Sequence, residues 1–149
     1  MSEVSVQTLS REAVVSAVLK QLDDGEAEAA AASLAIGFRY KDHGIGLEFS
    51  DKLRLTEYFQ KTRELYPDSK LQTDQVFVSG DHVITQWTLH FTLTEPFFGG
   101  LKRTIPISIA GVSVASIKDG MITDWADYYD GLTSRRTALA AHFTEWIEY

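Results

Sequence analysis

The dominant hydrophobic period of this chain changes near residue 70, and that change restricts the fold more than any other feature of the sequence. Before it, apolar residues recur at the three- and four-residue spacing of helices, whereas after it they alternate at the two-residue spacing of strands. Helices and strands that are segregated in this way are typical of α+β domains. The sequence therefore predicts a curved antiparallel sheet folded over the N-terminal helices, with a pocket between the two layers.

The first half is expected to hold three helices and one short strand. The helices run between Ser10 and Gly25, from Glu26 to about Leu34, and from about Asp51 to Leu65. Ser10 is a typical N-terminal cap and Gly25 a typical C-terminal stop. The strand covers residues 35–44, so that Phe38, Tyr40 and Asp42 share one of its faces.

The second half is expected to form a meander of long antiparallel strands and a closing helix. The strands are Lys70–Ser79, Val83–Leu93, Arg103–Ile117 and Met121–Tyr129, and the helix is Thr133–Tyr149. Asp119-Gly120 is a hairpin signal, and Glu95–Gly100 is a loop with Phe97 and Phe98 at its tip, which suits a lid or a dimer contact. The whole chain, residues 1–149, is thus predicted to be a single domain.

Composition excludes several classes of function. The chain carries 14 basic and 21 acidic residues, and a net charge of −7 makes a nucleic-acid partner unexpected. It has no cysteine, so thiolate nucleophiles and cysteine-based metal sites are excluded. The four histidines lack the spacing of a metal site, and no nucleotide-binding glycine motif is present, so no metal and no cofactor are predicted. Without a signal-peptide pattern or an apolar run of ~20 residues, we expect no membrane association and a cytoplasmic location.

Asp127 is the most conspicuous candidate for chemistry, because aspartate is disfavoured inside strands. If Trp125 and Tyr129 face inward, Asp127 faces inward between them. A carboxylate in an apolar pocket has a raised pKa, which suits general acid–base catalysis near neutral pH. If instead Ile122 and Tyr128 face the core, Asp127 lies in solvent. The alternation alone does not decide between these orientations.

Tyr40 and Asp42 share a strand face and are interpreted as a pair that orients a water or a substrate hydroxyl. Were Asp42 near Asp127, repulsion between like charges would keep one of the two protonated. The alternative for Asp42 is a turn-stabilising role beside His43 and Gly44. The expected apolar wall of the pocket consists of Phe38, Trp87, Leu89, Phe91, Trp125 and Tyr129.

Two motifs connect the chain with a known superfamily. The final hairpin reads Lys118-Asp119-Gly120-Met121-Ile122, followed by Trp125-Ala126-Asp127-Tyr128-Tyr129-Asp130, and the first strand contains Tyr40-Lys41-Asp42. Together with the order of elements, they resemble the nuclear-transport-factor-2-like (NTF2-like) superfamily, in its SnoaL-like polyketide cyclase and limonene-epoxide hydrolase branch. The resemblance implies a cone-shaped α+β fold and a homodimer. It also implies that Asp127 draws a proton from water held by Tyr40 and Asp42, where the hydrolases have asparagine at the second position.

The chain departs from the hydrolases on its middle strand. The hydrolases carry an Arg-x-Asp motif there, whose aspartate protonates the epoxide oxygen, and the matching positions here are Trp87 and Leu89. The proton-accepting half of the site is thus largely kept, and the proton-donating half is replaced by apolar groups. The leading hypothesis is therefore a cofactor-independent acid–base enzyme of secondary metabolism, a cyclase, isomerase or epoxide-opening enzyme acting on a small apolar polyketide- or terpenoid-like substrate. A non-catalytic binding or protein-interaction module and an epoxide hydrolase remain the alternatives.

Overall fold

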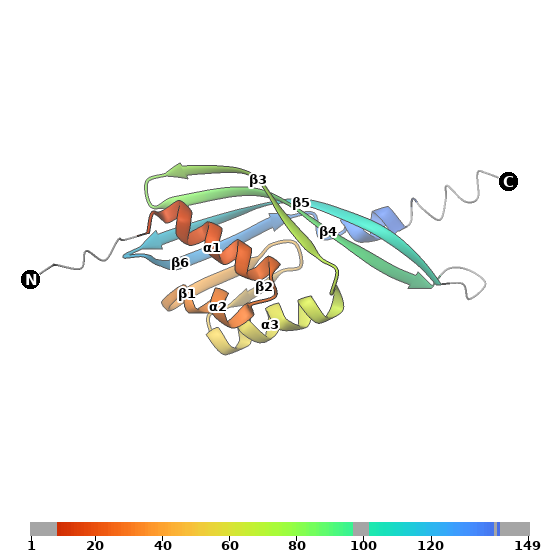
Figure 1. Ribbon diagram of the computed structural model, residues 1–149, viewed down its shortest axis with the longest axis horizontal. Helices are drawn as coiled ribbons and strands as arrows, with labels where there is room; N and C mark the ends of the chain where they lie inside the picture. Colours follow the sequence, from red (N-terminus) through yellow and green to blue (C-terminus); the bar gives the residue numbers. More distant parts are fainter. Residues whose placement is uncertain (1–8, 97–101, 139, 141–149) are drawn as a thin grey trace, which may run out of the picture.

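The computed structural model describes residues 9–96, 102–138 and 140, and these form a six-stranded sheet with helices on one face (Figure 1). The elements are α1 (Arg11–Asp23), α2 (Ala27–Ala32), β1 (Leu34–Asp42), β2 (Leu47–Phe49), α3 (Lys52–Leu65), β3 (Lys70–Ser79), β4 (His82–Pro96), β5 (Lys102–Lys118) and β6 (Met121–Tyr129), and residues 133–138 begin a C-terminal helix. The predicted aromatic tip at Phe97 and Phe98 and the helix beyond residue 140 lie outside the described residues. The α+β fold class is confirmed.

Local capping explains where the helices begin and end. The Ser10 hydroxyl accepts a hydrogen bond from the Ala13 amide at 3.1 Å, and Gly25 follows α1 with a φ of +77°. The Asp51 carboxylate accepts hydrogen bonds from the Leu53 and Arg54 amides and so caps α3, which ends before Pro67. Within the described part of the chain, no helix combines the length and apolar character needed to cross a membrane.

The strands are ordered β2-β1-β6-β5-β4-β3, and every neighbouring pair is antiparallel except β1 and β6, which are parallel. The edge strand β2 was not predicted, because its three residues are too few to show alternation. The sequence predicted that the strand ends at Leu93 and that a loop begins at Glu95. In the structure β4 continues to Pro96, because Pro96 still pairs with Lys102 of β5. In Figure 1 these two strands project together beyond the helices.

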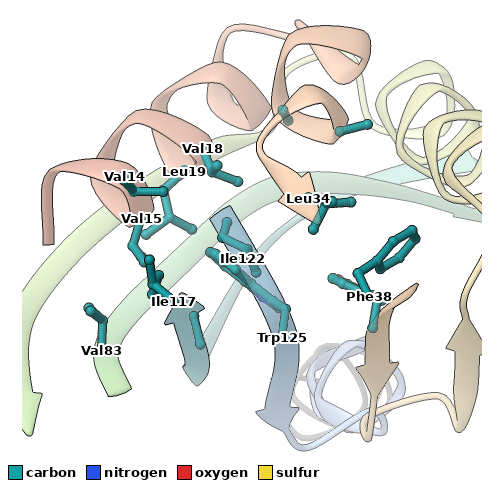
Figure 2. Packing of buried hydrophobic residues seen from close by; sticks show 14 of the residues in the cluster. Val14, Val15, Val18, Leu19, Leu34, Phe38, Val83, Ile117, Ile122 and Trp125 are labelled. Carbon is teal, nitrogen blue, oxygen red and sulfur yellow. The ribbon is translucent and has the colours of Figure 1, made fainter. Parts of the chain in front are cut away.

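The hydrophobic core consists of two clusters. In the first, Val14, Val15 and Val18 of α1 pack over the sheet against Ile117, Ile122 and Trp125 (Figure 2). The second lies further along the long strands and contains Trp87, Phe91, Ile105, Ile107, Ile109 and Ala138. Each fully buried aliphatic or aromatic side chain stabilises the fold by roughly 1.5–3 kcal/mol. The space between the two clusters is not filled by side chains, and the candidate site lies there.

Candidate active site

A β-bulge decides which way Asp127 points. Ser116 on β5 lies opposite Asp124, whereas the next residue, Ile117, lies opposite Ile122, so that Thr123 is an extra residue on β6. The extra residue reverses the alternation, and as a result both Ile122 and Trp125 are buried on the inner face. The two orientations predicted for this strand therefore both occur, one on each side of the bulge. Asp127 lies on the far side, and it faces inward together with Trp125.

Four polar residues form one row across the inner face of the sheet. Thr85 on β4 lies opposite Ser113 on β5, Ser113 lies opposite Asp127 on β6, and Asp127 lies opposite Asp42 on β1. Thr85, Ser113 and Asp42 are almost fully buried, and Asp127 is half-buried. Because buried polar groups cost free energy unless they are hydrogen-bonded, such a row needs partners.

The Asp127 carboxylate accepts hydrogen bonds from three uncharged donors. The Tyr40 hydroxyl donates to Oδ2 at 2.5 Å, while the Ser113 hydroxyl and the Trp125 indole N–H donate to Oδ1 at 2.5 and 2.7 Å. Ser113 in turn accepts a hydrogen bond from the Trp87 indole N–H at 2.8 Å. Two residues predicted for the site from separate strands, Tyr40 and Asp127, are thus in direct contact.

Burial raises the pKa of Asp127 above the ordinary range of an aspartate, because the charged form loses contact with water. The hydrogen bonds from Ser113, Tyr40 and Trp125 oppose that rise, and the negative charge of Asp42 adds to it. Burial, together with the nearby charge of Asp127, also raises the pKa of Tyr40. Tyr40 therefore stays a neutral phenol that donates its proton to Asp127, while Asp127 is a stronger base than an exposed aspartate.

Asp42 has its own set of donors. Its Oδ2 accepts hydrogen bonds from the Tyr58 and Tyr129 hydroxyls, both at 2.9 Å, and its Oδ1 accepts one from the Ile45 amide at 3.1 Å. The contact with Ile45 is the turn-stabilising role that the sequence analysis kept open, and the contacts with the tyrosines are additional. Burial and the contact with Asp42 raise the pKa of both tyrosines, so both remain protonated donors. Asp42 thereby joins β1, α3 and β6 at one point.

The two carboxylates lie in the wall of a cavity of about 570 Å³ that extends between the two core clusters. Eight of the nine predicted site residues line it, and they are Tyr40, Asp42, Trp87, Leu89, Phe91, Trp125, Asp127 and Tyr129. Phe38 does not line it. Phe38 shares the inner face of β1 with Tyr40, but it is 2% exposed and packs inside the first core cluster, so it supports the fold rather than the cavity.

Sequence reasoning missed two residues of the site, Ser113 and Tyr58. The sequence analysis gave Tyr58 no role in the site, but its hydroxyl donates a hydrogen bond to Asp42. The sequence contains one weak indication of Ser113 as a site residue: it is a small polar residue in an alternating series whose neighbours on the same face, Ile109 and Ala115, are apolar and buried. Serine is common on surfaces, so only the pairing of β5 with β6 shows that Ser113 meets Asp127.

The histidines lie apart from this site as far as they are described. His90 faces the opposite side of the sheet, where it lies within hydrogen-bonding distance of Ser108 and Gln72. His43 stacks on Tyr128, with ring centroids 4.2 Å apart. Over residues 9–96, 102–138 and 140, no group of three or more His, Cys, Asp or Glu side chains is arranged to hold a metal ion.

Gly111 makes room for Trp87. These residues are cross-strand partners, and a Cβ added at Gly111 would lie 2.3 Å from the Trp87 ring. We therefore expect Gly111→Ala to displace the indole and break its hydrogen bond to Ser113, at a cost of about 1–3 kcal/mol from overpacking. Urea unfolding together with tryptophan fluorescence would measure both effects. Gly120→Ala, at a hairpin position where a Cβ meets nothing within 4 Å, is the matched control: it should lower stability through its φ of +74° without disturbing the indole.

The curved, unclosed sheet with its N-terminal helices and the cavity between them defines an NTF2-like fold, and solved structures with this fold match the chain. IdmH from Streptomyces antibioticus, a proposed polyketide cyclase, has a TM-score of 0.75 and 17% identity over 87% of this chain and 99% of its own. A proposed SnoaL-like polyketide cyclase from Shewanella putrefaciens has a TM-score of 0.74 and 12% identity over 92% and 90%. A Catenulispora acidiphila protein with a ketosteroid isomerase-like fold has a TM-score of 0.71 and 17% identity over 83% and 90%.

The family model for SnoaL-like polyketide cyclases matches residues 13–137, which is most of the chain. The protein therefore belongs to the SnoaL-like polyketide cyclase family, and the resemblance inferred from the final hairpin and Tyr40-Lys41-Asp42 is confirmed. Among curated proteins, none matches the chain. The family supports an activity of the cyclase or isomerase type.

Proposed function

We propose that this protein is a cofactor-independent acid–base enzyme that rearranges or cyclises a small, mainly apolar substrate of the polyketide or terpenoid kind. The observation that carries the proposal is a carboxylate, Asp127, placed in the wall of a mainly apolar cavity, whose side-chain hydrogen-bond donors among the described residues are all uncharged. A carboxylate neutralised by an ion pair would favour a passive binding module. A carboxylate solvated by a phenol, a hydroxyl and an indole keeps its basicity and is a general base.

The chemistry needs only proton transfers. Asp127 takes a proton from a carbon next to a carbonyl, or from a hydroxyl, and the electron pair of that bond forms the new bond to an electrophilic carbon of the same molecule. The bond that breaks in exchange, a carbonyl π bond or an epoxide C–O bond, leaves its electron pair on oxygen. That oxygen receives a proton from the Tyr40 hydroxyl, which recovers one from Asp127 across their 2.5 Å hydrogen bond. The product is an isomer of the substrate, and the enzyme is unchanged.

The cavity supports an apolar substrate of moderate size. Its lining is mainly apolar and includes Leu19, Leu71, Leu89, Phe91, Leu93 and Ile109, while polar side chains lie around the two carboxylates and also elsewhere in the wall, where Arg63 contacts the backbone of Asp23 and Ser69. A volume of about 570 Å³ lies within the usual range for small-molecule sites, ~300–1,000 Å³. The neighbours described as polyketide cyclases favour a fused-ring or linear polyketide-like skeleton over a terpenoid one.

Product mass distinguishes the three hypotheses made from the sequence. The purified protein would be incubated in D₂O with a panel of apolar polyketide-like ketones and epoxides, and the products would be analysed by mass spectrometry. We expect a product with a new chromatographic retention time and, after transfer to H₂O, the mass of the substrate, because the proposed step places the deuteron on an oxygen, where it exchanges. A product that has gained the mass of water would indicate an epoxide hydrolase instead. Tight binding of panel members without turnover or deuterium exchange would indicate a binding module and would contradict the proposal.

The pH dependence of the reaction follows from the raised pKa of Asp127. A general base works in its ionised form, so kcat/KM should rise with pH and level off above that pKa. The rising limb should lie above the usual aspartate pKa of about 3.9. Because the folded state holds this proton more tightly than the unfolded chain, the contribution of Asp127 to the free energy of unfolding should fall as pH rises through the same window, and the difference between wild type and Asp127→Asn in urea unfolding would isolate that contribution. A rate limb at or below the usual aspartate range would contradict the assignment of Asp127 as the base.

A further inference from the structure

We propose that Trp87 and Ser113 are positioning residues that hold Asp127 in one orientation, so that its Oδ2, beside the Tyr40 hydroxyl, is the atom that accepts the substrate's proton. The inference rests on the proposed function, because it assigns roles within the same acid–base site. It goes beyond that function by naming the reacting atom and two residues that act through Asp127 without being the base themselves.

The two carboxylate oxygens are not equivalent. An ionised carboxylate offers about four acceptor positions, two on each oxygen. Oδ1 uses both of its positions, for the Ser113 hydroxyl and the Trp125 indole N–H. Oδ2 uses one, for the Tyr40 hydroxyl, and no other residue in the described ranges donates to it, so one position is left. The remaining position is therefore on Oδ2, and it is the place where a substrate proton can be bound without displacing a protein donor.

The chain of donors has a fixed direction. An indole N–H can only donate, so Trp87 must give its hydrogen to the Ser113 oxygen. Ser113 then has its own hydrogen left to give, and Asp127 receives it. The Trp87 ring is buried and lies over Gly111, where a Cβ would overlap it. Packing therefore holds the first donor of this hydrogen-bond series in place. Ser113 therefore cannot reverse its hydroxyl without leaving a buried indole N–H unpaired, which is costly.

Thr85 provides a built-in comparison. It is the cross-strand partner of Ser113, faces the same side of the sheet and is fully buried. Its hydroxyl oxygen has no hydrogen-bond partner within the described part of the chain. Thr85 thus has the position and the chemistry of Ser113, one strand further from Asp127, but makes none of its contacts. Replacing the two hydroxyls separately isolates the effect of the donor chain from that of burying a polar group here.

The other titratable groups around Asp127 are the same in every variant of the test. They are Tyr40 and Asp42 on β1, Tyr58 on α3 and Tyr129 on β6, and Arg63 and Arg135 also line the cavity. The hydrogen bonds of Tyr40 to Asp127 and of Tyr58 and Tyr129 to Asp42 do not involve Ser113, whereas the Trp87 ring lies beside that of Tyr129, with centroids 6.0 Å apart. A change in the Asp127 titration on replacing Ser113 therefore reports the lost donor.

The test is a carboxyl-carbon NMR titration of Asp127 in the full chain with ¹³C-labelled aspartate, comparing wild type with Ser113→Ala, Trp87→Phe and Thr85→Val. Loss of a hydrogen bond to the charged form should raise the Asp127 pKa by about one pH unit in Ser113→Ala, since ~1.4 kcal/mol corresponds to one unit. Trp87→Phe should cause a smaller rise, and Thr85→Val none. On a turned-over substrate, kcat should fall roughly 10-fold in Ser113→Ala with KM unchanged, because only the transition state loses stabilisation.

The titration needs no substrate, so its outcome is separate from that of the proposed function. An Asp127 pKa in Ser113→Ala equal to that of wild type, in a variant whose near-ultraviolet circular dichroism shows a native fold, would overturn the inference. If Ser113→Ala does not fold, Trp87→Phe decides, because it keeps an aromatic ring at this position and the serine, and removes the indole N–H that donates to Ser113. An equal rise in Thr85→Val would also overturn it. A shifted titration without any catalytic turnover would refute the proposed function alone.

Discussion

Replacing Asp127 by asparagine is expected to lower kcat at least ~10²-fold on any substrate that the wild-type protein converts, since this is the usual contribution of a general base. Asparagine has nearly the same shape and keeps one acceptor oxygen for Ser113 and Trp125, but it cannot accept a proton at neutral pH. The loss should therefore appear in kcat while the protein remains folded. Steady-state kinetics with the substrate found in the D₂O screen would measure it.

Asp124→Asn is the matched control for this prediction. Asp124 lies on the same strand three residues earlier, but it faces solvent and pairs with Arg39 at 3.0 Å. Pairs of this kind contribute little, so activity and stability should change hardly at all. If Asp127→Asn turns over substrate at the wild-type rate, Asp127 is not the base. If both variants lose activity equally, a general effect of charge rather than a specific base accounts for the loss.

Replacing Asp42 by leucine is expected to produce the largest loss of stability. The change leaves three donors without an acceptor: the Tyr58 and Tyr129 hydroxyls and the Ile45 amide. With Asp42 only 3% exposed, the expected cost is about 3–5 kcal/mol, since each unsatisfied buried group costs ~1–3 kcal/mol and the tyrosines can recover part of theirs from water in the cavity. Urea unfolding at neutral pH would measure the change in midpoint.

The conservative variant Asp42→Asn separates two effects of the leucine substitution: the loss of an acceptor for the hydrogen-bond donors and the loss of the negative charge. Asparagine retains an acceptor oxygen for the two tyrosines and is the residue that the epoxide-hydrolase branch carries at this place, so we expect a cost of only about 1 kcal/mol. Its removal of a negative charge near Asp127 should lower the Asp127 pKa, because that charge contributes to the rise. Equal destabilisation by leucine and asparagine would show that Asp42 does not join β1, α3 and β6 through its acceptor oxygens.

Local sequence signals predicted the ends of helices and the turns well where a single residue or dipeptide fixes them. Ser10 begins α1 by capping it, Pro67 follows the end of α3, and Asp119-Gly120 forms the last turn, with φ values of 51° and 74°. These features depend on neighbouring residues only, so they can be read along the chain. The inner face of β1 was predicted for the same reason, because strict alternation places Phe38, Tyr40 and Asp42 on one side.

Only the tertiary structure decided which of the inward-facing side chains reach the cavity and which groups they contact. The bulge at Thr123 turned Asp127 inward, and it depends on the register between β5 and β6 rather than on any local pattern. Phe38 and Tyr40 share a face, yet only Tyr40 reaches the cavity. Ser113 and Tyr58 entered the site because the strand pairing and the position of α3 brought their hydroxyls to carboxylates far away in the sequence.

The sequence by itself thus determined the class of fold and the order of most elements, since periodicity and capping are short-range properties of the backbone and its neighbours, and it made Asp127 and Asp42 candidates without deciding where either side chain points. The structure determined which oxygen of Asp127 has an unused acceptor position, which donors hold the carboxylate and how large the cavity beside it is. Those depend on contacts between strands and helices separated by tens of residues, and hydrogen-bond geometry is fixed only when all of them are packed together.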